Sequence, residues 1–480
     1  MKLRDVLKDI EILETNADLD MEITAVEADS RKVSAGALFV AVVGYESDGH
    51  RFIPMAYDKG ASCTLCQKKP ECDIPYVLTR DTRKGLALSS ANFYGRPSEK
   101  MKIVGVTGTN GKTTTTSIIK FLIEKCTGAK VGLVGTNGNM IGTKFIDTER
   151  TTPESNELQA LFAQMYSEGC SYVVMEVSSH ALYLDRVYGV QFEVGCFTNL
   201  TEDHLDFHKT MEEYGKAKAI LFDRCRVGSI NIDDPYGKVI AAGAKSPCKS
   251  CSVKEKADYT AENISLNDDS VEFDLIRGGE SFAVKLNIPG EFNVYNAMTA
   301  LSACDALGIS LADACKAIEN FGGVMGRAEV VPTGRDFTVI IDYAHTPDAL
   351  ENIIRTVRGF AKGRVVTLFG CGGDRDALKR PIMGKIAAEL SDFVVVTSDN
   401  PRTEVPSAII GDILEGLKDT KTPYTVIENR KEAIGWAIEN AEKRDIIILA
   451  GKGHETYQII GKEKYHFDER EVVAEFLNNK

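Results

Sequence analysis

A short glycine-rich segment, residues 108–113, has the residue types of a loop that binds phosphate groups. Its sequence, GTNGKT, follows the apolar run IVGV and precedes apolar residues at helical spacing, which predicts a strand, a loop and a helix. Glycines let backbone N–H groups approach oxygen anions, the Lys112 amine reaches the outer phosphates, and the Thr113 hydroxyl binds Mg²⁺ in such loops. The usual pattern has glycine where this chain has Val106. We interpret the segment as a nucleoside triphosphate site, with a loop that binds nothing as the less favoured alternative.

Three further side chains after this loop are candidates for metal or phosphate chemistry. The predicted buried strand 171–176 ends in Glu176, a candidate Mg²⁺ ligand, direct or through an intermediate; a buried carboxylate with a local partner is the alternative. His204 lies in an acidic loop after the next strand and is a candidate metal ligand, although a loop histidine is more often solvated. Lys218 lies on the apolar stripe of a predicted helix, which lysine stems commonly tolerate.

The C-terminal third alternates strand-like and helical stretches, which predicts a parallel, doubly wound sheet. The predicted strands are FTVII (337–341), RVVTLF (364–369), FVVV (393–396), YTVI (424–427) and IIILA (446–450). Polar loops follow four of them: DYAHTPDAL (342–350), GCGGDRDALKRP (370–381), SDNPRTEVP (398–406) and GKGHE (451–455). Because the carboxyl ends of parallel strands meet at one edge of a sheet, we expect these loops to form one site.

Length and composition limit the class of protein. The 480 residues predict two or three domains, and the net charge of −13 argues against a nucleic-acid partner. The N-terminus lacks a signal-peptide pattern and no apolar run is long enough for a membrane span, so we expect a cytoplasmic protein without membrane insertion. We expect the 12 cysteines to be reduced thiols; zinc at the Cys63/Cys66 and Cys248/Cys251 pairs is a disfavoured alternative.

These patterns predict an α/β protein of three domains: 1–97, 98–325 and 326–480. The first is a small α/β domain, in which Ser30 and Arg31 lie on a turn that either holds a polar ligand or is solvated. The second holds the phosphate loop and has a β-rich edge over 228–290. Its Asn293 and Asn296 lie in the first turn of a predicted helix, where they cap the helix or recognise a base, and capping is the default.

Taken together, segments spread over nearly the full length resemble the Mur ligases, ATP-dependent amide-forming enzymes of peptidoglycan synthesis. The segments are DSR, FVAVVG, TGTNGKTTT, TTPES, MEVSSHAL, NLTEDHLDFH, YGKAKAILF, GRAE, DYAHTPDAL, GCGGDRD, SDNPRTE and GKGHE. The resemblance implies a central ATPase domain, a C-terminal Rossmann-like domain, and a reaction in two steps. A substrate carboxylate attacks the γ-phosphate of ATP to give an acyl phosphate and ADP, and the amine of an amino acid then displaces phosphate.

The resemblance also implies roles for individual residues. Lys112, Glu176, His204 and Lys218 are the expected catalytic residues; Thr113 and Glu176 would serve one Mg²⁺ and His204 a second, and Lys218 matches a position where the family carries a carbamylated lysine. The residues expected around ATP are Gly108, Thr109, Asn110, Gly111, Lys112, Thr113, Thr114, Asn293, Arg327, Asp342 and His345. Those expected around the second substrate, UDP-MurNAc-L-Ala-D-Glu, are Ser30, Thr151, Thr152, Ser178 and Arg186. The chain departs from relatives' patterns at Arg150, at Leu184 and at Tyr45-Glu46-Ser47.

The choice of amino acid depends on the segment 399–402. Meso-2,6-diaminopimelate differs from lysine by a carboxylate at its far end, which an arginine meets with two hydrogen bonds; lysine would leave the guanidinium unpaired, at a cost of about 1–3 kcal/mol. We therefore expect diaminopimelate, with a lysine-adding ligase as the alternative. The expected residues are Arg375, Asp399, Asn400, Pro401, Arg402, Gly451 and Glu455, with both arginines on the carboxylate.

Two further alternatives differ in what ATP is used for. A folylpolyglutamate-type synthetase is disfavoured by the DNPR and TTPES segments. A protein that hydrolyses ATP as a switch leaves the four polar C-terminal loops without a role. We expect a monomer.

Overall fold

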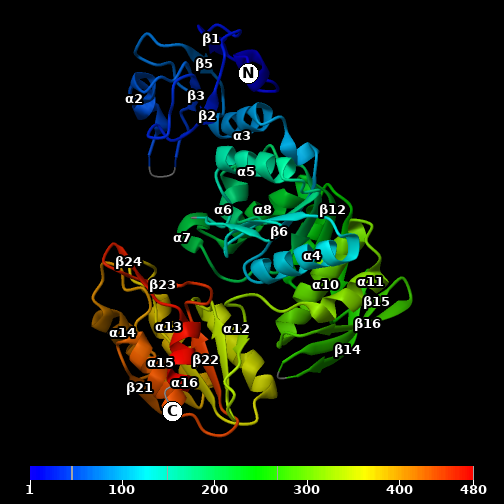
Figure 1. The fold of residues 1–480 in the computed structure, drawn as a ribbon, viewed down its shortest axis with the longest axis vertical. Coiled ribbons are helices and arrows are strands. Elements are labelled where there is room, and N and C mark those ends of the chain that lie inside the picture. Colours follow the sequence, from blue (N-terminus) through cyan, green and yellow to red (C-terminus); the bar gives the residue numbers. More distant parts are fainter. Residues whose placement is uncertain (45–46, 149, 268, 479–480) are drawn as a thin grey trace.

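The computed structural model describes residues 1–44, 47–148, 150–267 and 269–478. Tyr45 and Glu46, where the chain departs from the Mur ligase pattern, therefore lie outside the described residues. Figure 1 shows three α/β bodies that follow one another along the chain, each with its own sheet. This architecture confirms the predicted three-part α/β fold; the exact boundaries after residues 97 and 325 stay predictions. No helix in the described ranges is long and apolar enough to cross a lipid bilayer.

The N-terminal body has a sheet in the order β1-β5-β4-β3-β2, parallel except at the edge strand β1. Its strands are β1 (Glu14–Thr15), β2 (Ala25–Glu27), β3 (Ala37–Val40), β4 (Cys63–Cys66) and β5 (Tyr76–Leu78). Its helices are α1 (Leu3–Val6), η1 (Gly49–Phe52), α2 (Ile53–Asp58) and α3 (Thr82–Phe93).

The central body has a sheet in the order β16-β15-β14-β13-β12-β11-β6-β10-β7-β8-β9. The run from β7 to β14 is parallel, and antiparallel hairpins extend both edges, which confirms the predicted β-rich edge. The strands are β6 (Lys102–Thr107), β7 (Val131–Val134), β8 (Asn139–Ile141), β9 (Lys144–Ile146), β10 (Tyr172–Glu176), β11 (Phe192–Phe197), β12 (Cys225–Asn231), β13 (Cys248–Ser252), β14 (Tyr259–Leu266), β15 (Val271–Arg277) and β16 (Glu280–Leu286). The helices are η2 (Pro97–Glu99), α4 (Lys112–Thr127), α5 (Ser155–Ser167), α6 (Ser179–Tyr183), α7 (Leu205–His208), α8 (Met211–Ala219), η3 (Ile220–Asp223), α9 (Pro235–Gly243), α10 (Glu291–Ala306), α11 (Leu311–Ala317) and η4 (Ile318–Asn320).

The C-terminal body has a sheet in the order β17-β18-β22-β19-β20-β21. The five predicted strands pair in parallel, but the sheet is mixed, because β17 adds an antiparallel edge that the sequence analysis missed. The strands are β17 (Glu329–Val331), β18 (Thr338–Asp342), β19 (Val365–Phe369), β20 (Phe393–Val396), β21 (Tyr424–Val426) and β22 (Ile446–Ala450), followed by the hairpin β23 (Tyr457–Ile460) and β24 (Glu463–His466). The helices are α12 (Pro347–Phe360), α13 (Lys379–Leu390), α14 (Pro406–Glu415), α15 (Arg430–Glu439) and α16 (Glu469–Asn478).

Helix α4 is packed firmly into the core of the central body, and this fixes the position of the loop that precedes it. Ile118, Ile119, Leu122 and Ile123 are fully buried in the core of the central body. Their spacing puts them on one face of the helix, and burying a side chain of this size contributes about 1.5–3 kcal/mol. The N-terminus of α4 is therefore held rigidly at the carboxyl end of β6.

Candidate active site

The loop between β6 and α4 has the shape of a phosphate-binding loop. Gly108 has φ +151°, and a Cβ there would lie 1.8 Å from Thr198 Oγ1. Gly111 has φ +83°, and its Cβ would lie 2.4 Å from Asn296 Oδ1. Both positions require glycine, because a side chain would collide with neighbouring segments and strain the backbone. Thr109 N and Asn110 N donate to the main-chain and side-chain oxygens of Asn199, at 2.9 Å each, which fixes the loop against the end of β11.

The Lys112 side chain folds back over this loop. Its Nζ donates to Gly108 O (3.0 Å) and Thr109 O (2.7 Å). Burial lowers the pKa of the amine, while the nearby carboxylates of Glu176 and Asp203 act in the opposite direction. Lys112 therefore lies at the position from which an amine can turn to phosphate oxygens at the start of a helix.

Glu176, at the end of β10, faces the same region and is held by a residue that the sequence analysis missed. Its carboxylate accepts from Thr136 N (2.9 Å) and Thr136 Oγ1 (3.0 Å), and Thr136 Oγ1 also meets Thr151 Oγ1 (3.0 Å). The side chain is buried. Glu176 thus has a local partner in Thr136, and its carboxylate keeps further lone pairs that can meet a cation.

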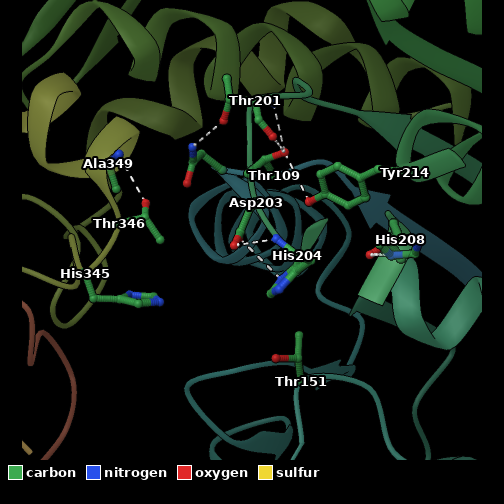
Figure 2. Close-up of polar contacts among 12 residues, drawn as sticks. Thr109, Thr151, Thr201, Asp203, His204, His208, Tyr214, His345, Thr346 and Ala349 are labelled. Atoms are coloured by element: carbon green, nitrogen blue, oxygen red, sulfur yellow. Dashed lines mark hydrogen bonds and ion pairs between the residues drawn. The ribbon is translucent and has the colours of Figure 1, made fainter. Parts of the chain in front are cut away.

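His204 is the N-cap residue of α7 and takes a left-handed backbone conformation, φ 55°. Its ring lies 3.4 Å from the Asp203 carboxylate, and its pKa is lowered by burial, with Asp203 opposing. In Figure 2, His204, Thr151 and His345 come from separate segments and point toward a common region beside Thr109. A neutral imidazole there is able to bind a cation.

Lys218, on α8, is fully buried beside the phosphate loop. Its Nζ donates to Gly108 O at 2.8 Å and lies 4.3 Å from the centre of the Tyr214 ring. Burial lowers the pKa of this amine well below its ordinary value, and the positive charge of Lys112 lowers it further. A lowered pKa favours the neutral, nucleophilic form of the amine.

Removing the Lys218 amine should change how stability depends on pH. An amine whose pKa is lowered on folding binds fewer protons in the folded than in the unfolded state, so it destabilises the fold below its ordinary pKa and does so less as pH rises. This contribution to the free energy of unfolding grows by up to about 1.4 kcal/mol per pH unit. In CO₂-free buffer, the stability advantage of Lys218→Met over wild type, measured by urea unfolding, should therefore shrink from pH 7 to pH 9. Lys216→Met, an exposed position on α8, is the control, and a difference that is constant with pH would contradict the expectation.

The helix-capping interpretation of Asn293 and Asn296 is wrong. Gly290 is the N-cap residue of α10 and makes no side-chain cap. Asn293 Nδ2 donates to Pro289 O (2.7 Å), and its Oδ1 accepts from Asn296 Nδ2 (2.9 Å). Asn296 Oδ1 in turn accepts from Thr115 Oγ1 (3.2 Å) next to Gly111. The two asparagines thus support the phosphate loop through Asn296, which lies against Gly111. A helical sequence pattern alone does not reveal such a contact.

The connector between the central and C-terminal bodies, residues 324–328, reaches the phosphate loop. Arg327 Nη2 donates to Thr113 Oγ1 (3.2 Å), and the guanidinium lies 4.7 Å from the centre of the Tyr343 ring. Within the described residues, Arg327 Nε is buried without a hydrogen-bond partner. Buried donors are normally satisfied, so this group fits an acceptor supplied by a ligand.

Asp342 and His345 lie on the loop after β18, next to this connector. The half-buried Asp342 carboxylate accepts from Ala328 N (2.7 Å) and Ala344 N (2.8 Å), and partial loss of water contact raises its pKa. His345 is exposed at its outer side; its Nδ1 lies 2.8 Å from Tyr343 O, and desolvation by the surrounding loops, followed by the charge of Lys379, lowers its pKa. The structure thus brings Arg327, Asp342 and His345 together at one side of the phosphate loop.

The four polar loops of the C-terminal body meet as predicted. Lys379 Nζ donates to His345 O (2.8 Å), which joins the first and second loops. Gly373 N donates to Asn400 O (2.9 Å), and Asn400 Nδ2 donates to Glu455 Oε2 (2.9 Å), which joins the second, third and fourth.

Arg402 and Arg375, the two expected carboxylate-binding residues, flank Gly372. A Cβ at Gly372 would lie 2.9 Å from Arg402 Nη1 and 3.9 Å from Arg375 Cγ. Arg402 Nη1 donates to Gly373 O (2.9 Å), whereas Arg375 is exposed and donates to Asp374 O. The structure therefore places both guanidiniums at one loop, and Arg402 is the more firmly held.

The acids expected around the amino acid surround a buried lysine that the sequence analysis missed. Lys452 Nζ donates to Asn400 Oδ1 (3.0 Å) and Glu455 Oε2 (3.2 Å) and lies 3.5 Å from Asp399 Oδ1. Asp399 is buried; burial alone would raise its pKa, but the positive charge of Lys452 and its neighbours lowers it overall. A Cβ at Gly451 would lie 2.4 Å from Asp399 Oδ2, so only glycine fits there.

The residues expected to bind the UDP-linked substrate divide into two groups. Thr152 Oγ1 donates to Glu176 O (2.9 Å) and accepts from Ser178 N (3.1 Å), and Arg186 Nη1 donates to Thr152 O (3.2 Å). With Thr151, these residues form one cluster beside Glu176. Ser30 lies in the N-terminal body, where its hydroxyl meets Met55 Sδ at 3.5 Å, so the structure does not join it to the cluster.

Asp348, on α12, joins the C-terminal body to the phosphate loop. Its Oδ2 accepts from Asn110 Nδ2 (2.6 Å) and Thr201 Oγ1 (2.9 Å), both in the central body. Hydrogen bonds to a charged group contribute about 1.5–3 kcal/mol each, so this carboxylate is a substantial part of the contact.

Asp348→Ala should therefore loosen the C-terminal body. We expect a larger radius of gyration in small-angle X-ray scattering of the ligand-free protein, because losing two hydrogen bonds shifts the population by roughly a hundredfold at the low end of their strength. Glu351→Ala, a partly exposed position on α12 that pairs with Arg355, is the control. Superimposable scattering curves for Asp348→Ala and wild type would contradict the expectation.

The chain is similar to known protein families, to individual proteins and to solved structures. Families described as "Mur ligase family, catalytic domain", "Mur ligase middle domain" and "Mur ligase, glutamate ligase domain" match residues 22–94, 106–304 and 326–453. A UDP-N-acetylmuramoyl-L-alanyl-D-glutamate–2,6-diaminopimelate ligase of Clostridium acetobutylicum is 50% identical, with 99% of each chain covered, and one of Clostridioides difficile is 46% identical, with 100% covered. A solved structure of a ligase with that name has TM-score 0.74 and 31% identity over 100% of this chain and 99% of the other. A Mycobacterium tuberculosis folylpolyglutamate synthase, at 18% identity and TM-score 0.64, shows a shared fold alone.

The site combines a glycine-rich loop at a helix N-terminus with the polar loops of a second sheet. This arrangement defines an enzyme that uses a nucleoside triphosphate to act on a second substrate. The protein is a ligase. The chain belongs to the Mur ligase family. The family's three domains match most of its length, and a relative with half its residues identical matches 99% of it.

The zinc alternative for the cysteine pairs finds no support in the described ranges. Cys63 and Cys66 are buried in β4 and Cys251 in β13, and these cysteines and Cys248 are free thiols. No group of three or more histidine, cysteine, aspartate or glutamate side chains in the described part of the chain is arranged to hold a metal ion.

Proposed function

We propose that the protein uses ATP to join meso-2,6-diaminopimelate to the D-glutamyl carboxylate of UDP-MurNAc-L-Ala-D-Glu, in peptidoglycan precursor synthesis. The observation that carries the proposal is the position of Arg402, beside Gly372 and within the ring of C-terminal loops. A guanidinium there suits an amino acid with a second carboxylate, because lysine would leave it unpaired. The names of the relatives support the same choice.

The proposed reaction has two steps. A γ-carboxylate oxygen of the D-glutamyl residue bonds to the γ-phosphorus of ATP, the bond to the β-phosphate oxygen breaks, and ADP leaves. The amine nitrogen of the amino acid then bonds to the acyl carbon, phosphate leaves with the electron pair of the C–O bond, and the nitrogen loses a proton. The first step brings anions together, so Lys112 and the N-terminus of α4 stabilise the charge on the transferred group.

The residues around the phosphate loop fit Mg²⁺. Thr113 and Glu176 offer oxygen donors, and Mg²⁺ commonly takes one or two protein oxygens with substrate phosphates completing its coordination. When bound, the ion would neutralise phosphate charge. We assign His204 and a carbamylated Lys218 to a second ion, because adding CO₂ converts a neutral amine into an anion.

The remaining assignments concern the other ligands and the setting. The UDP-linked substrate is assigned to Ser30, Thr151, Thr152, Ser178 and Arg186, with Ser30 contributed by the N-terminal body. Besides the phosphate loop, ATP is assigned to Asn293, Arg327, Asp342 and His345. We propose that the protein acts as a monomer in the cytoplasm, where ATP is available.

Purified protein tests the proposal directly. With ATP, Mg²⁺, UDP-MurNAc-L-Ala-D-Glu and diaminopimelate, we expect ADP release matched mole for mole by a product one diaminopimelate residue heavier in mass spectrometry. A higher kcat/KM for L-lysine would select the lysine-adding alternative. ATP hydrolysis that is indifferent to the carboxylate substrate would select the switch and overturn the proposal.

A further inference from the structure

The fourth loop of the C-terminal body contains a cation that no step of the reaction uses. Lys452 follows β22 and is fully buried. Its Nζ reaches Asn400 Oδ1 and Glu455 Oε2 and lies 3.5 Å from Asp399 Oδ1. A buried lysine is costly unless it is paired, so its position among three acceptors has a structural reason.

The hydrogen bonds and ion pairs of Lys452 lead to side chains expected around the amino acid. Asn400 is held at both ends of its amide: Oδ1 accepts from Lys452 Nζ and from Ile459 N (2.9 Å), and Nδ2 donates to Glu455 Oε2 (2.9 Å). Glu455 Oε2 thus receives two donors, Lys452 and Asn400. Removing the lysine would leave Asn400 Oδ1 with Ile459 N as its donor and Glu455 Oε2 with Asn400, so both side chains would be held less firmly.

A second buried ion pair contacts the backbone just before Lys452. Arg430 and Glu469 are both fully buried and form an ion pair at 2.8 Å, and Arg430 Nη2 donates to Ala450 O (2.8 Å), two residues before Lys452. The formal charges of Asp399, Glu455 and Lys452 sum to −1, a net charge that suits an incoming ammonium group.

We infer that Lys452 is a positioning residue that fixes Asn400 and Glu455 and sets the charge of the ammonium-binding side of the amino-acid site. This inference rests on the proposed function. It assigns Lys452 no contact with substrate: the lysine acts through the side chains it holds. The ligand class that follows is an amino acid whose ammonium group faces Asp399 and Glu455.

Three substitutions separate charge from hydrogen bonding at position 452. Lys452→Gln keeps donors and removes the charge, Lys452→Arg keeps the charge, and Lys452→Met removes both. In steady-state assays of ADP release by the full chain, we expect KM for diaminopimelate to rise at least tenfold in Lys452→Gln and more in Lys452→Met. KM for ATP should stay within twofold, and Lys452→Arg should recover most of the loss. Lys431→Gln, a more exposed lysine on α15 that pairs with Glu475, is the control.

The outcomes distinguish this inference from the proposed function. A wild type that forms no amide product overturns the proposed function itself, and the inference with it. An active wild type with unchanged KM for diaminopimelate in Lys452→Gln, or with equal increases for ATP and diaminopimelate, overturns the inference alone. If Lys452→Met does not fold, as a circular dichroism melt would show, the Gln and Arg variants decide by the same criteria.

Discussion

Lys112→Ala should reduce turnover by about a thousandfold or more, because on the proposed function it removes the phosphate-loop cation that stabilises the transferred group. Removing one group that stabilises transition-state charge typically costs a factor of 10²–10³, about 3–4 kcal/mol, and a lysine carries a full charge. Its amine donates to Gly108 O and Thr109 O, so phosphate would draw it from neutral acceptors without breaking an ion pair. The measurement is ADP release with all substrates and Mg²⁺ at saturation.

The control for this prediction lies on the same helix. Lys120 is largely buried on α4 and pairs with Glu124 at 2.8 Å, so Lys120→Ala removes a lysine without touching the phosphate loop. We expect its kcat to stay within a few-fold of wild type. A Lys112→Ala enzyme with more than a tenth of wild-type kcat would show that the loop does not bind the reacting phosphate in the way proposed.

Arg402→Ala should raise the KM for diaminopimelate by roughly 10- to 100-fold and leave the KM for ATP nearly unchanged. The estimate corresponds to the 1.5–3 kcal/mol of a hydrogen bond between charged groups. The backbone supports a fixed position for this side chain: Arg402 N donates to Ile459 O (3.1 Å), and Gly461 N donates to Arg402 O (2.8 Å). Its φ of 51° is unfavourable for a residue with a side chain, and such strain persists where surrounding structure imposes it, often at binding sites.

Two comparisons make the Arg402 prediction specific. L-lysine lacks the second carboxylate, so its kcat/KM should change far less in Arg402→Ala than that of diaminopimelate. Arg358→Ala, in the same body, removes a surface guanidinium that pairs with Asp392 and should change neither constant. Equal increases in KM for ATP and diaminopimelate would mean that Arg402 acts on the fold of the loops and not on the substrate carboxylate.

The features predicted well from the sequence are those encoded locally. The phosphate loop was predictable because its strand, glycines, lysine and helix are consecutive, and the structure places β6 and α4 on either side of it. The five C-terminal strands were predictable because each is a short apolar run between turn residues. Strand β17 was missed because three residues, Glu329–Val331, carry no periodic signal.

The side chains that were missed depend on partners distant in the sequence. Lys452 lies 52 residues from Asn400, and Asp348 lies 238 residues from Asn110, so no local pattern pairs them. Thr136, which holds Glu176, belongs to a turn without a recognisable motif. The asparagines of α10 were misassigned as caps because the sequence gives their position in the helix but not their neighbours in the folded protein. The resemblance to a family named the expected ligand residues but not the residues that support them.

The connector between the central and C-terminal bodies constrains how such proteins can be recombined. Met325 O accepts from Asn137 Nδ2 (3.0 Å), Arg327 reaches Thr113, and a Cβ at Gly326 would lie 2.1 Å from His454 N. A hybrid enzyme joined at this segment would combine the phosphate loop of one parent with the arginine, Asp342 and Asp348 of the other. Exchange of C-terminal bodies between relatives should therefore succeed only where both parents share these contact residues, however similar their folds.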